Sequence, residues 1–204
     1  MSAVFAKRWM IVWAGAVVML VLVASAVLRP AEGRSTKDKG AVNVVLYDAG
    51  GDRVGHAKLK PAGDGETRVQ ARITDAAPGF HGFHVHTIGK CDPAAPAGPF
   101  TSAGGHFSLA GQTHGGHAGD LPSLLVMEGN SARLEFVTDR FEVADLRDAD
   151  GSAVMVHAGR DNFANIPPRY VSTTSGQPGP DSDTLATGDA GSRYACGEIE
   201  AKDS

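Results

Sequence analysis

The sequence predicts an all-β domain, an antiparallel sandwich or barrel of eight strands that carries two long functional loops. Short apolar and β-branched runs recur between clusters of turn residues. Glycine is frequent, with 26 residues among 204, and no stretch of the domain has the spacing of an amphipathic helix. Two connections, about residues 88–120 and 159–193, are rich in Gly, Pro, Ser and Asp. Loops of this length in a compact domain are usually functional or disordered.

Eight segments between Ala41 and Ala201 have the composition of strands. The alternation is clear where Val69, Ala71 and Ile73 are separated by polar residues, as on a half-buried strand. The predicted strands are Val42–Tyr47, Val54–Lys60, Thr67–Ile73, Phe80–Thr87, Leu121–Met127, Ala132–Thr138, Ala153–Ala158 and Tyr194–Ala201.

Composition and charge exclude several classes of protein. Hydrophobic residues make up 42 % of the chain, which is typical of a globular protein and not of a disordered one. The 19 basic and 23 acidic residues give a net charge of −4, so no nucleic-acid partner is expected. The chain has two cysteines but eight histidines, and the histidines are the feature that requires an explanation.

Residues 1–28 form a separate segment that directs the chain to a membrane. Lys7 and Arg8 precede an uncharged apolar run, Trp9–Leu28. Ala24-Ser25-Ala26 fits a signal-peptide cleavage site, whereas 20 apolar residues are also enough for an uncleaved N-terminal membrane anchor. Both interpretations stay open.

In either case the rest of the chain is exported, because basic residues before an apolar run stay in the cytoplasm. The location is then the cell envelope, the periplasm or the extracellular space, with membrane tethering through residues 9–28 if the anchor is kept. Residues 29–40 are polar and predict a flexible linker to the domain at 41–204.

Two histidines share one face of a predicted strand. Residues at i and i+2 of a strand project to the same side, so His84 and His86 lie together while Phe83 and Val85 enter the core. His81 has the parity of Phe83 and is expected to be structural. Two adjacent imidazoles form half of a metal site, although two solvated polar residues would produce the same pattern.

The next segment strengthens the metal hypothesis. His106, His114, His117 and Asp120 lie within 15 residues and are separated by glycines. Such a loop can wrap around an ion, and its nitrogen and oxygen donors suit a borderline ion such as zinc. A polar surface loop remains the alternative.

Another histidine, His157, lies at the end of the apolar strand Ala153–Ala158, and Asp161 follows four residues later. Taken alone, His157 is more typical of a strand end than of a ligand.

Together these stretches resemble the copper-zinc superoxide dismutases, in particular the exported bacterial type. The similarity extends over about Ala41–Ala201 and follows the order of the family's motifs. The stretches that carry it are His81-Gly82-Phe83-His84-Val85-His86, Gly105-His106-Phe107, His117-Ala118-Gly119-Asp120-Leu121-Pro122 and Thr187-Gly188-Asp189-Ala190-Gly191-Ser192-Arg193-Tyr194-Ala195-Cys196-Gly197.

The resemblance implies a Greek-key barrel with immunoglobulin-like architecture and a two-metal centre. His106 is expected to bridge the two ions, and Asp161 to act as an outer carboxylate that orients one histidine on each side. The implied copper ligands are His84, His86, His106 and His157, and the implied zinc ligands are His106, His114, His117 and Asp120.

The resemblance also implies the activity, conversion of superoxide to dioxygen and hydrogen peroxide by copper cycling between Cu(II) and Cu(I). This reaction would protect the cell against superoxide outside the cytoplasm. Arg193 is expected to attract the anion beside copper, His106 to supply a proton, and Thr187 to narrow the channel mouth. Arg193 matters because the acidic chain has an anionic substrate.

By the same resemblance, Cys91 and Cys196 form a disulfide across 105 residues, with two free thiols as the alternative. Closing a loop of about 100 residues stabilises a chain by about 4.7 kcal/mol in the chain-entropy description. Export makes oxidation of the pair plausible.

Two departures from the family pattern concern the zinc side. Ser108-Leu109 replaces the usual Asn-Pro, and only two residues separate His114 from His117, where the family has a longer loop. A copper-only enzyme is therefore one alternative, and a non-catalytic copper-binding or buffering domain is another. A homodimer is compatible with the family, but no apolar strand face in the sequence indicates the contact surface.

Overall fold

The structure is a computed structural model that describes residues 40–109 and 111–202. The predicted signal peptide or anchor at 1–28, and with it the membrane contact through 9–28, lies outside the described residues. The same holds for the predicted linker apart from Gly40. Within the described ranges, no helix has the length and apolar character needed to cross a bilayer.

The described chain forms nine strands, one more than the sequence predicts. The predicted strand Phe80–Thr87 is interrupted at Gly82, whose N–H donates to the carbonyl of Gly159 instead of a neighbouring strand. A side chain on Gly82 would meet the Cβ of Ala190 at 2.7 Å, so this close approach requires glycine. The strands are β1 Val42–Asp48, β2 Arg53–Gly63, β3 Glu66–Ile73, β4 Gly79–His81, β5 Phe83–His86, β6 Leu124–Val126, β7 Ala132–Thr138, β8 Ser152–His157 and β9 Arg193–Ile199.

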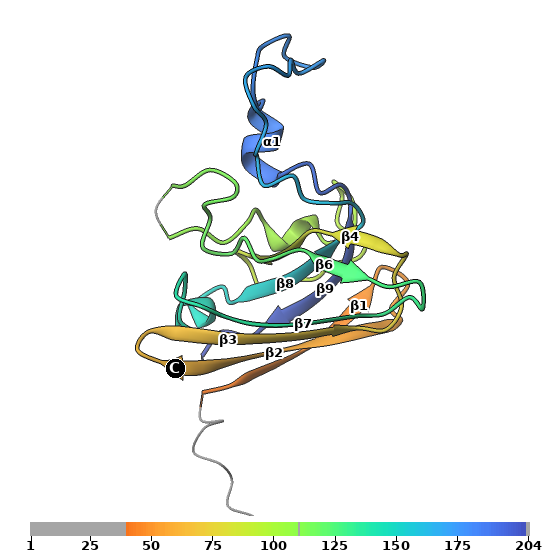
Figure 1. The fold of residues 1–204 in the computed structure, drawn as a ribbon. Helices are drawn as coiled ribbons and strands as arrows, with labels where there is room; N and C mark the ends of the chain where they lie inside the picture. Colours follow the sequence, from red (N-terminus) through yellow and green to blue (C-terminus); the bar gives the residue numbers. More distant parts are fainter. Residues whose placement is uncertain (1–39, 110, 203–204) are drawn as a thin grey trace, which may run out of the picture. The chain divides into compact units, whose positions relative to one another are not determined.

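The antiparallel all-β prediction is confirmed. Seven strands form one sheet in the order β5-β8-β9-β1-β2-β3-β7, while β4 pairs with β6 in a second ribbon. Neighbours such as β3 and β7, or β9 and β1, are not consecutive in the chain, as in a Greek key. Figure 1 shows that the large sheet curls into a half-barrel, with the two long loops gathered on one side.

Helical structure is limited to short segments in the connections. The helix α1, Ser182–Thr187, lies in the second long loop, and 3-10 turns span Thr101–Ala103 and Asp145–Arg147. The carboxylate of Asp181 caps α1 by accepting the N–H of Thr184. Fewer than two helical turns show no amphipathic period, so the sequence pattern did not reveal α1.

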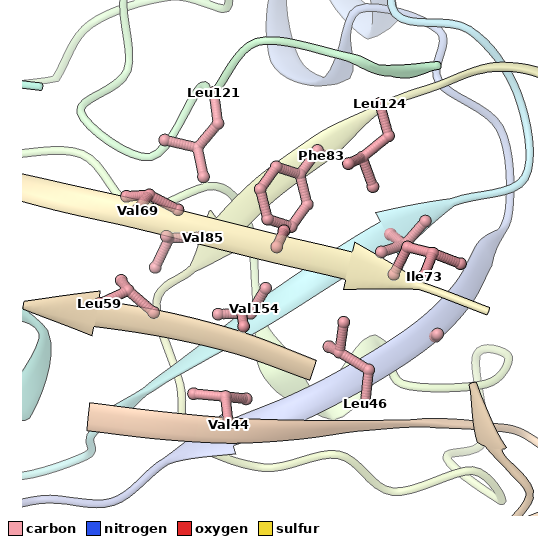
Figure 2. Packing of buried hydrophobic residues seen from close by; sticks show 14 of the residues in the cluster. Val44, Leu46, Leu59, Val69, Ile73, Phe83, Val85, Leu121, Leu124 and Val154 are labelled. Carbon is pink, nitrogen blue, oxygen red and sulfur yellow. The ribbon is translucent and has the colours of Figure 1, made fainter. Parts of the chain in front are cut away.

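Alternating side chains of the strands fill the interior of the half-barrel. Leu46, Leu59, Ile73 and Phe83 are fully buried in one cluster (Figure 2). Full burial of such a side chain contributes about 1.5–3 kcal/mol, so this cluster provides a rigid base for the loops.

A disulfide joins Cys91 in the first long loop to Cys196 in β9, the pairing that the resemblance implies. Cys196 belongs to a second, smaller apolar cluster with Phe100 and Met155. The covalent link therefore fixes the start of the first loop against the strand that begins at Arg193.

Candidate metal centre

Three histidines of the centre lie on strands, and we call His84, His86 and His157 the strand group. His84 and His86 come from β5, and β8 runs beside β5 and ends at His157. The first two side chains are 0 % and 1 % exposed, because the long loops cover the outer face of β5. The alternative of two solvated strand residues is therefore wrong.

Hydrogen bonds fix the ring orientation of each member of the strand group. Nδ1 of His86 donates to the carbonyl of Gly104 at 2.9 Å, and Nδ1 of His157 donates to that of Gly191 at 3.0 Å. Nε2 of His84 donates to Oδ2 of Asp161 at 2.7 Å. Each ring thus directs its other nitrogen, without a hydrogen, toward a common point.

His106 from the first long loop completes this point. One ring nitrogen from each of His84, His86, His106 and His157 lies within 4.8 Å of the other three. Nδ1 of His84 and Nε2 of His106 are buried without a hydrogen-bond partner among the described residues. Four convergent neutral imidazoles, two with unpartnered buried lone pairs, fit a copper ion.

The remaining candidates lie on the first long loop, and we call His106, His114, His117 and Asp120 the loop group. Oδ1 of Asp120 accepts a hydrogen bond from Nδ1 of His106 at 2.9 Å, and Nδ1 of His114 is 3.2 Å from both atoms. His84, His106, His114 and Asp120 form a second set of ligand atoms that all lie within 4.8 Å of one another. This set of imidazole nitrogens and one carboxylate fits zinc.

His117 lies beside this set without belonging to it. Its backbone N–H donates to Oδ2 of Asp120 at 2.9 Å, and its Nδ1 is 3.3 Å from Oδ1 of the same carboxylate. The ring centroids of His114 and His117 are 5.8 Å apart. The two-residue spacing therefore leaves both rings next to Asp120.

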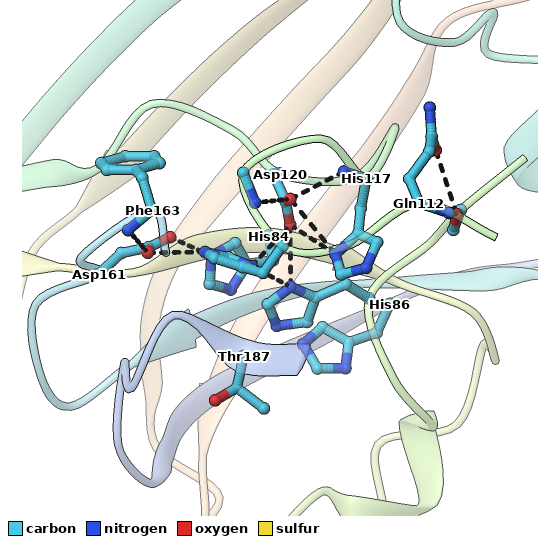
Figure 3. A network of polar contacts seen from close by, with 12 residues as sticks. His84, His86, Gln112, His117, Asp120, Asp161, Phe163 and Thr187 are labelled. Carbon is cyan, nitrogen blue, oxygen red and sulfur yellow. Dashed lines mark hydrogen bonds and ion pairs between the residues drawn. The ribbon is translucent and has the colours of Figure 1, made fainter. Parts of the chain in front are cut away.

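Asp161 connects the two groups. Its Oδ2 accepts from His84 and its Oδ1 from Nε2 of His114, both at 2.7 Å (Figure 3). The N–H of Phe163 donates to the same Oδ1 at 2.7 Å. A side chain at Gly188 would lie 2.1 Å from Oδ1, so only glycine allows the second long loop to cover this carboxylate.

Electrostatics differ between the two groups. Burial lowers the pKa of His106 to about 4 and, together with repulsion from His84, that of His157 to about 3. Burial also disfavours a charge on His114, but the hydrogen bonds that it donates to the carboxylates of Asp120 and Asp161 outweigh this effect and raise the pKa of His114 to about 9.

The pKa values of the two carboxylates, Asp120 and Asp161, are lowered, in contrast to the raised pKa of His114. Burial would raise the pKa of Asp120 and of Asp161, yet their hydrogen bonds to histidines hold both pKa values well below the ordinary range. Both carboxylates are therefore negative at neutral pH and available to the loop group.

Arg193 lies next to the strand group. Its guanidinium donates to the carbonyls of Phe100 at 2.5 Å and of Gly104 at 2.6 Å. Because Gly104 also accepts from His86, one carbonyl orients both the cation and a ring of the strand group. Thr187, by contrast, is exposed at the end of α1, where its hydroxyl donates to the carbonyl of Asp183.

Sequence reasoning missed two residues that support the loop group. The guanidinium of Arg140 donates to the carbonyls of His117 at 3.0 Å, Asp120 at 3.2 Å and Gly115 at 3.3 Å. Phe163 stacks on His114, with ring centroids 6.4 Å apart. Arg140 follows an ordinary strand, and no spacing rule links it to the loop. The one sequence signal for Phe163 is its position two residues after Asp161.

Comparison with known proteins identifies the family. The profile described as copper/zinc superoxide dismutase (SODC) matches residues 54–199. The chain belongs to the copper/zinc superoxide dismutase family. It is 49 % identical over 142 residues to a copper-zinc superoxide dismutase of Mycolicibacterium paratuberculosis, covering 67 % of this chain and 61 % of that relative. The chain thus spans less than two thirds of that protein's length.

Two further members of the superoxide dismutase family support the assignment. The enzyme of Mycobacterium tuberculosis is 45 % identical over 178 residues, which cover 82 % of this chain and 74 % of that relative. A solved structure of Cu/Zn superoxide dismutase from Brucella abortus is 27 % identical, with a TM-score of 0.59, and the match covers 78 % of this chain and 99 % of that one.

Proposed function

We propose that the protein is a copper-zinc superoxide dismutase that converts superoxide to dioxygen and hydrogen peroxide. The observation that carries this proposal is that two buried sets of ligand atoms lie side by side and share His84 and His106. The strand group and Nε2 of His106 would hold copper, and the loop group, including His117 and Nδ1 of His106, would hold zinc. A non-catalytic copper-binding domain would not need a ring that serves both sets.

Copper held by imidazoles would supply the electron transfer, since these ligands tolerate both Cu(II) and Cu(I). The protein's part begins with attraction of the substrate anion. Arg193 stays charged at neutral pH, and its two carbonyl contacts hold it beside His86. In a chain of net charge −4, this fixed cation supplies local positive potential for superoxide.

His106 is suited to move a proton to the product. Its Nδ1 faces Asp120 and the proposed zinc side, so Nε2 is the atom that can take and release a proton next to the strand group. Because burial lowers the pKa of His106 to about 4, a proton placed on Nε2 is given up readily at neutral pH. We assign Asp161 to orientation of His84 and His114, and Thr187 to the channel mouth.

We propose further that the protein is exported and acts outside the cytoplasm, with residues 1–28 as a signal peptide or an anchor. The disulfide supports an oxidising location. The test is cell fractionation followed by N-terminal sequencing of the mature protein. A start after Ala26 indicates cleavage, an intact apolar run in the membrane fraction indicates an anchor, and a cytoplasmic protein contradicts export.

A homodimer is the assembly that we propose. Phe80 and Leu125 are 53 % and 48 % exposed and lie directly opposite each other on the β4–β6 ribbon, and Met127, just after β6, is 60 % exposed. An exposed apolar strip of this kind is typical of a contact between subunits. Sedimentation equilibrium of the wild type and of Leu125→Glu tests it, and a wild-type monomer at micromolar concentration contradicts it.

The activity is tested by following superoxide decay with the full chain loaded with copper and zinc, across a range of ionic strengths. We expect rapid decay that slows as salt increases, because screening weakens attraction of the anion. Arg193→Ala should lower the rate about tenfold and flatten its salt dependence, with copper content unchanged. No decay with fully loaded protein contradicts the function, and unchanged kinetics of the variant contradict the role of Arg193.

A further inference from the structure

The outer surface of the strands β2, β3 and β7 is strongly basic. Along β2 and β3 the core side chains Ala57, Leu59, Val69 and Ala71 are buried, so the residues between them project outward. We define the basic face as His56, Lys58, Lys60, Arg68, Arg72 and Arg133.

The register places the basic side chains of this face opposite one another. Lys60 pairs with Arg68, and Arg72 lies directly opposite both His56 and Arg133. Like charges in directly opposed positions destabilise a sheet, so this arrangement gives the fold no benefit. A face selected only for solubility would gain from opposite charges in the same positions.

The described carboxylates leave the two arginines Arg72 and Arg133 of this face without an ion pair. Glu135 accepts from Arg68 at 2.9 Å and from Gln70 at 2.9 Å, and Glu66 projects outward at the end of the β2–β3 hairpin. Among residues 40–109 and 111–202, no ion pair involves Arg72 or Arg133. These two guanidiniums are therefore free to meet an external anion.

The basic face does not serve the metal centre. Figure 1 shows β2, β3 and β7 on one side of the half-barrel and the two long loops on the other. The apolar core lies under the basic face, and the histidines lie beneath the loops. A cationic face on the side away from the metal centre, on a chain with 23 acidic and 19 basic residues, suits an anionic partner other than superoxide.

We propose that the basic face docks onto an anionic phospholipid surface. A depression of about 290 Å³ is lined in part by Arg72 and Arg133, with Glu135 at its side, and the two guanidiniums offer several donors to phosphate headgroups. The sequence supports a lipid partner, because the apolar run Trp9–Leu28 precedes β1 of the same sheet by only a short segment. In sequence, that segment, 29–40, holds four basic and two acidic residues.

Docking in this orientation keeps the long loops, and with them the metal centre, away from the lipid. The inference is independent of the proposed activity, since it concerns only the opposite side of the sheet. It predicts contact with anionic lipid that depends on Arg72 and Arg133 and weakens with salt.

The test uses the full chain reconstituted in vesicles, with one fluorescent label at Asn43→Cys. Both native cysteines are in the disulfide, so the new thiol is labelled alone. Asn43 is exposed on β1, opposite Lys58. Quenchers attached to the lipid headgroups reduce the fluorescence of the label when it touches the membrane. Vesicles that contain phosphatidylglycerol are compared with neutral phosphatidylcholine vesicles. A second variant, labelled at Thr173→Cys, reports whether the second long loop touches the lipid.

We expect quenching at position 43 in anionic vesicles alone, reversed by 0.5 M salt (about a 4 Å screening length), and none at position 173. Arg72→Glu/Arg133→Glu should weaken docking roughly fivefold or more for each arginine. The matched reversal Lys90→Glu/Arg169→Glu, on the long loops, should leave it unchanged. Equal quenching in neutral vesicles, no quenching, or a response to a DNA duplex but not to vesicles would overturn the proposal.

Discussion

The strand group and the loop group of the metal centre are held by different kinds of contact. His86 and His157 are oriented by backbone carbonyls, and the register of β5 with β8 fixes the positions from which the strand group projects. The loop group depends mainly on side chains, because Asp120 and Asp161 hold His114 and Arg140 supports the loop backbone. In the strand group only His84 is held by a side chain, the same carboxylate of Asp161.

This difference predicts a robust copper side and an adjustable zinc side. Sheet geometry is maintained by the whole barrel, whereas the loop group relies on a few charged contacts. The pKa values follow the same division, since that of His157 is lowered to about 3 and that of His114 is raised to about 9. Four predictions test the contrast.

The largest effect is expected from His86→Ala, which removes a ring of the strand group. Superoxide conversion should fall by more than ~100-fold, beyond the range typical of outer-shell changes, while the loop group still binds zinc. Superoxide decay and metal analysis measure the two quantities, and His56→Ala is the control because His56 is exposed on β2. Equal loss of zinc and copper would show that the two groups are not separable.

Asp161→Asn should affect the loop group more than the strand group, because His86 and His157 keep their backbone carbonyl bonds in the variant. The amide cannot accept from His84 and His114 in the same way, and loss of such a carboxylate typically costs about 10- to 100-fold in metal affinity. Zinc and copper affinities are compared by competition with chelators, with the exposed Asp183→Asn as control. A greater loss of copper than of zinc contradicts the contrast.

The pH dependence of metal binding should also separate the groups. Below pH 9 His114 carries a proton that zinc must displace, so zinc affinity should rise about tenfold per pH unit from pH 7 to 9. Over this range His86 and His157, whose pKa values are lowered mainly by burial, are already unprotonated, so copper affinity should change much less with pH. Titrations of the metal-free chain measure both slopes, and a flat zinc profile would contradict the raised pKa of His114.

The smallest effect is expected from Arg140→Gln, which removes the guanidinium from three carbonyls of the loop. Zinc should dissociate about fivefold faster, as for a loss of ~1 kcal/mol, and copper should be unaffected. Arg147→Gln is the matched control, since Arg147 also donates to two carbonyls, those of Glu200 and Ala201. Identical zinc release in both variants would exclude a supporting role for Arg140.

The strand group and the loop group also differ in how much of their geometry could be predicted from the sequence. Strand parity was enough to place His84 and His86 on one face, because the period of two is a local property. It did not predict their burial, which depends on loops distant in the sequence. No sequence signal indicated the role of Arg140 either, because the positions of its carbonyl partners depend on the path of the loop.

The interruption at Gly82 and the short helix α1 were also missed. Gly82 is constrained by Ala190, which lies more than a hundred residues away in the chain. The carboxylate of Asp181 that caps α1 contacts Ser172 as well, so tertiary contacts define this end of the loop.

Anomalous diffraction at the copper and zinc edges, from crystals of the metal-loaded protein, tests the central claim most directly. We predict copper on Nδ1 of His84 and Nε2 of His86, His106 and His157, and zinc on Nδ1 of His106 with the rest of the loop group. Copper on the loop group, or one ion with no ligand from His106, would contradict the division of the centre into these two sites.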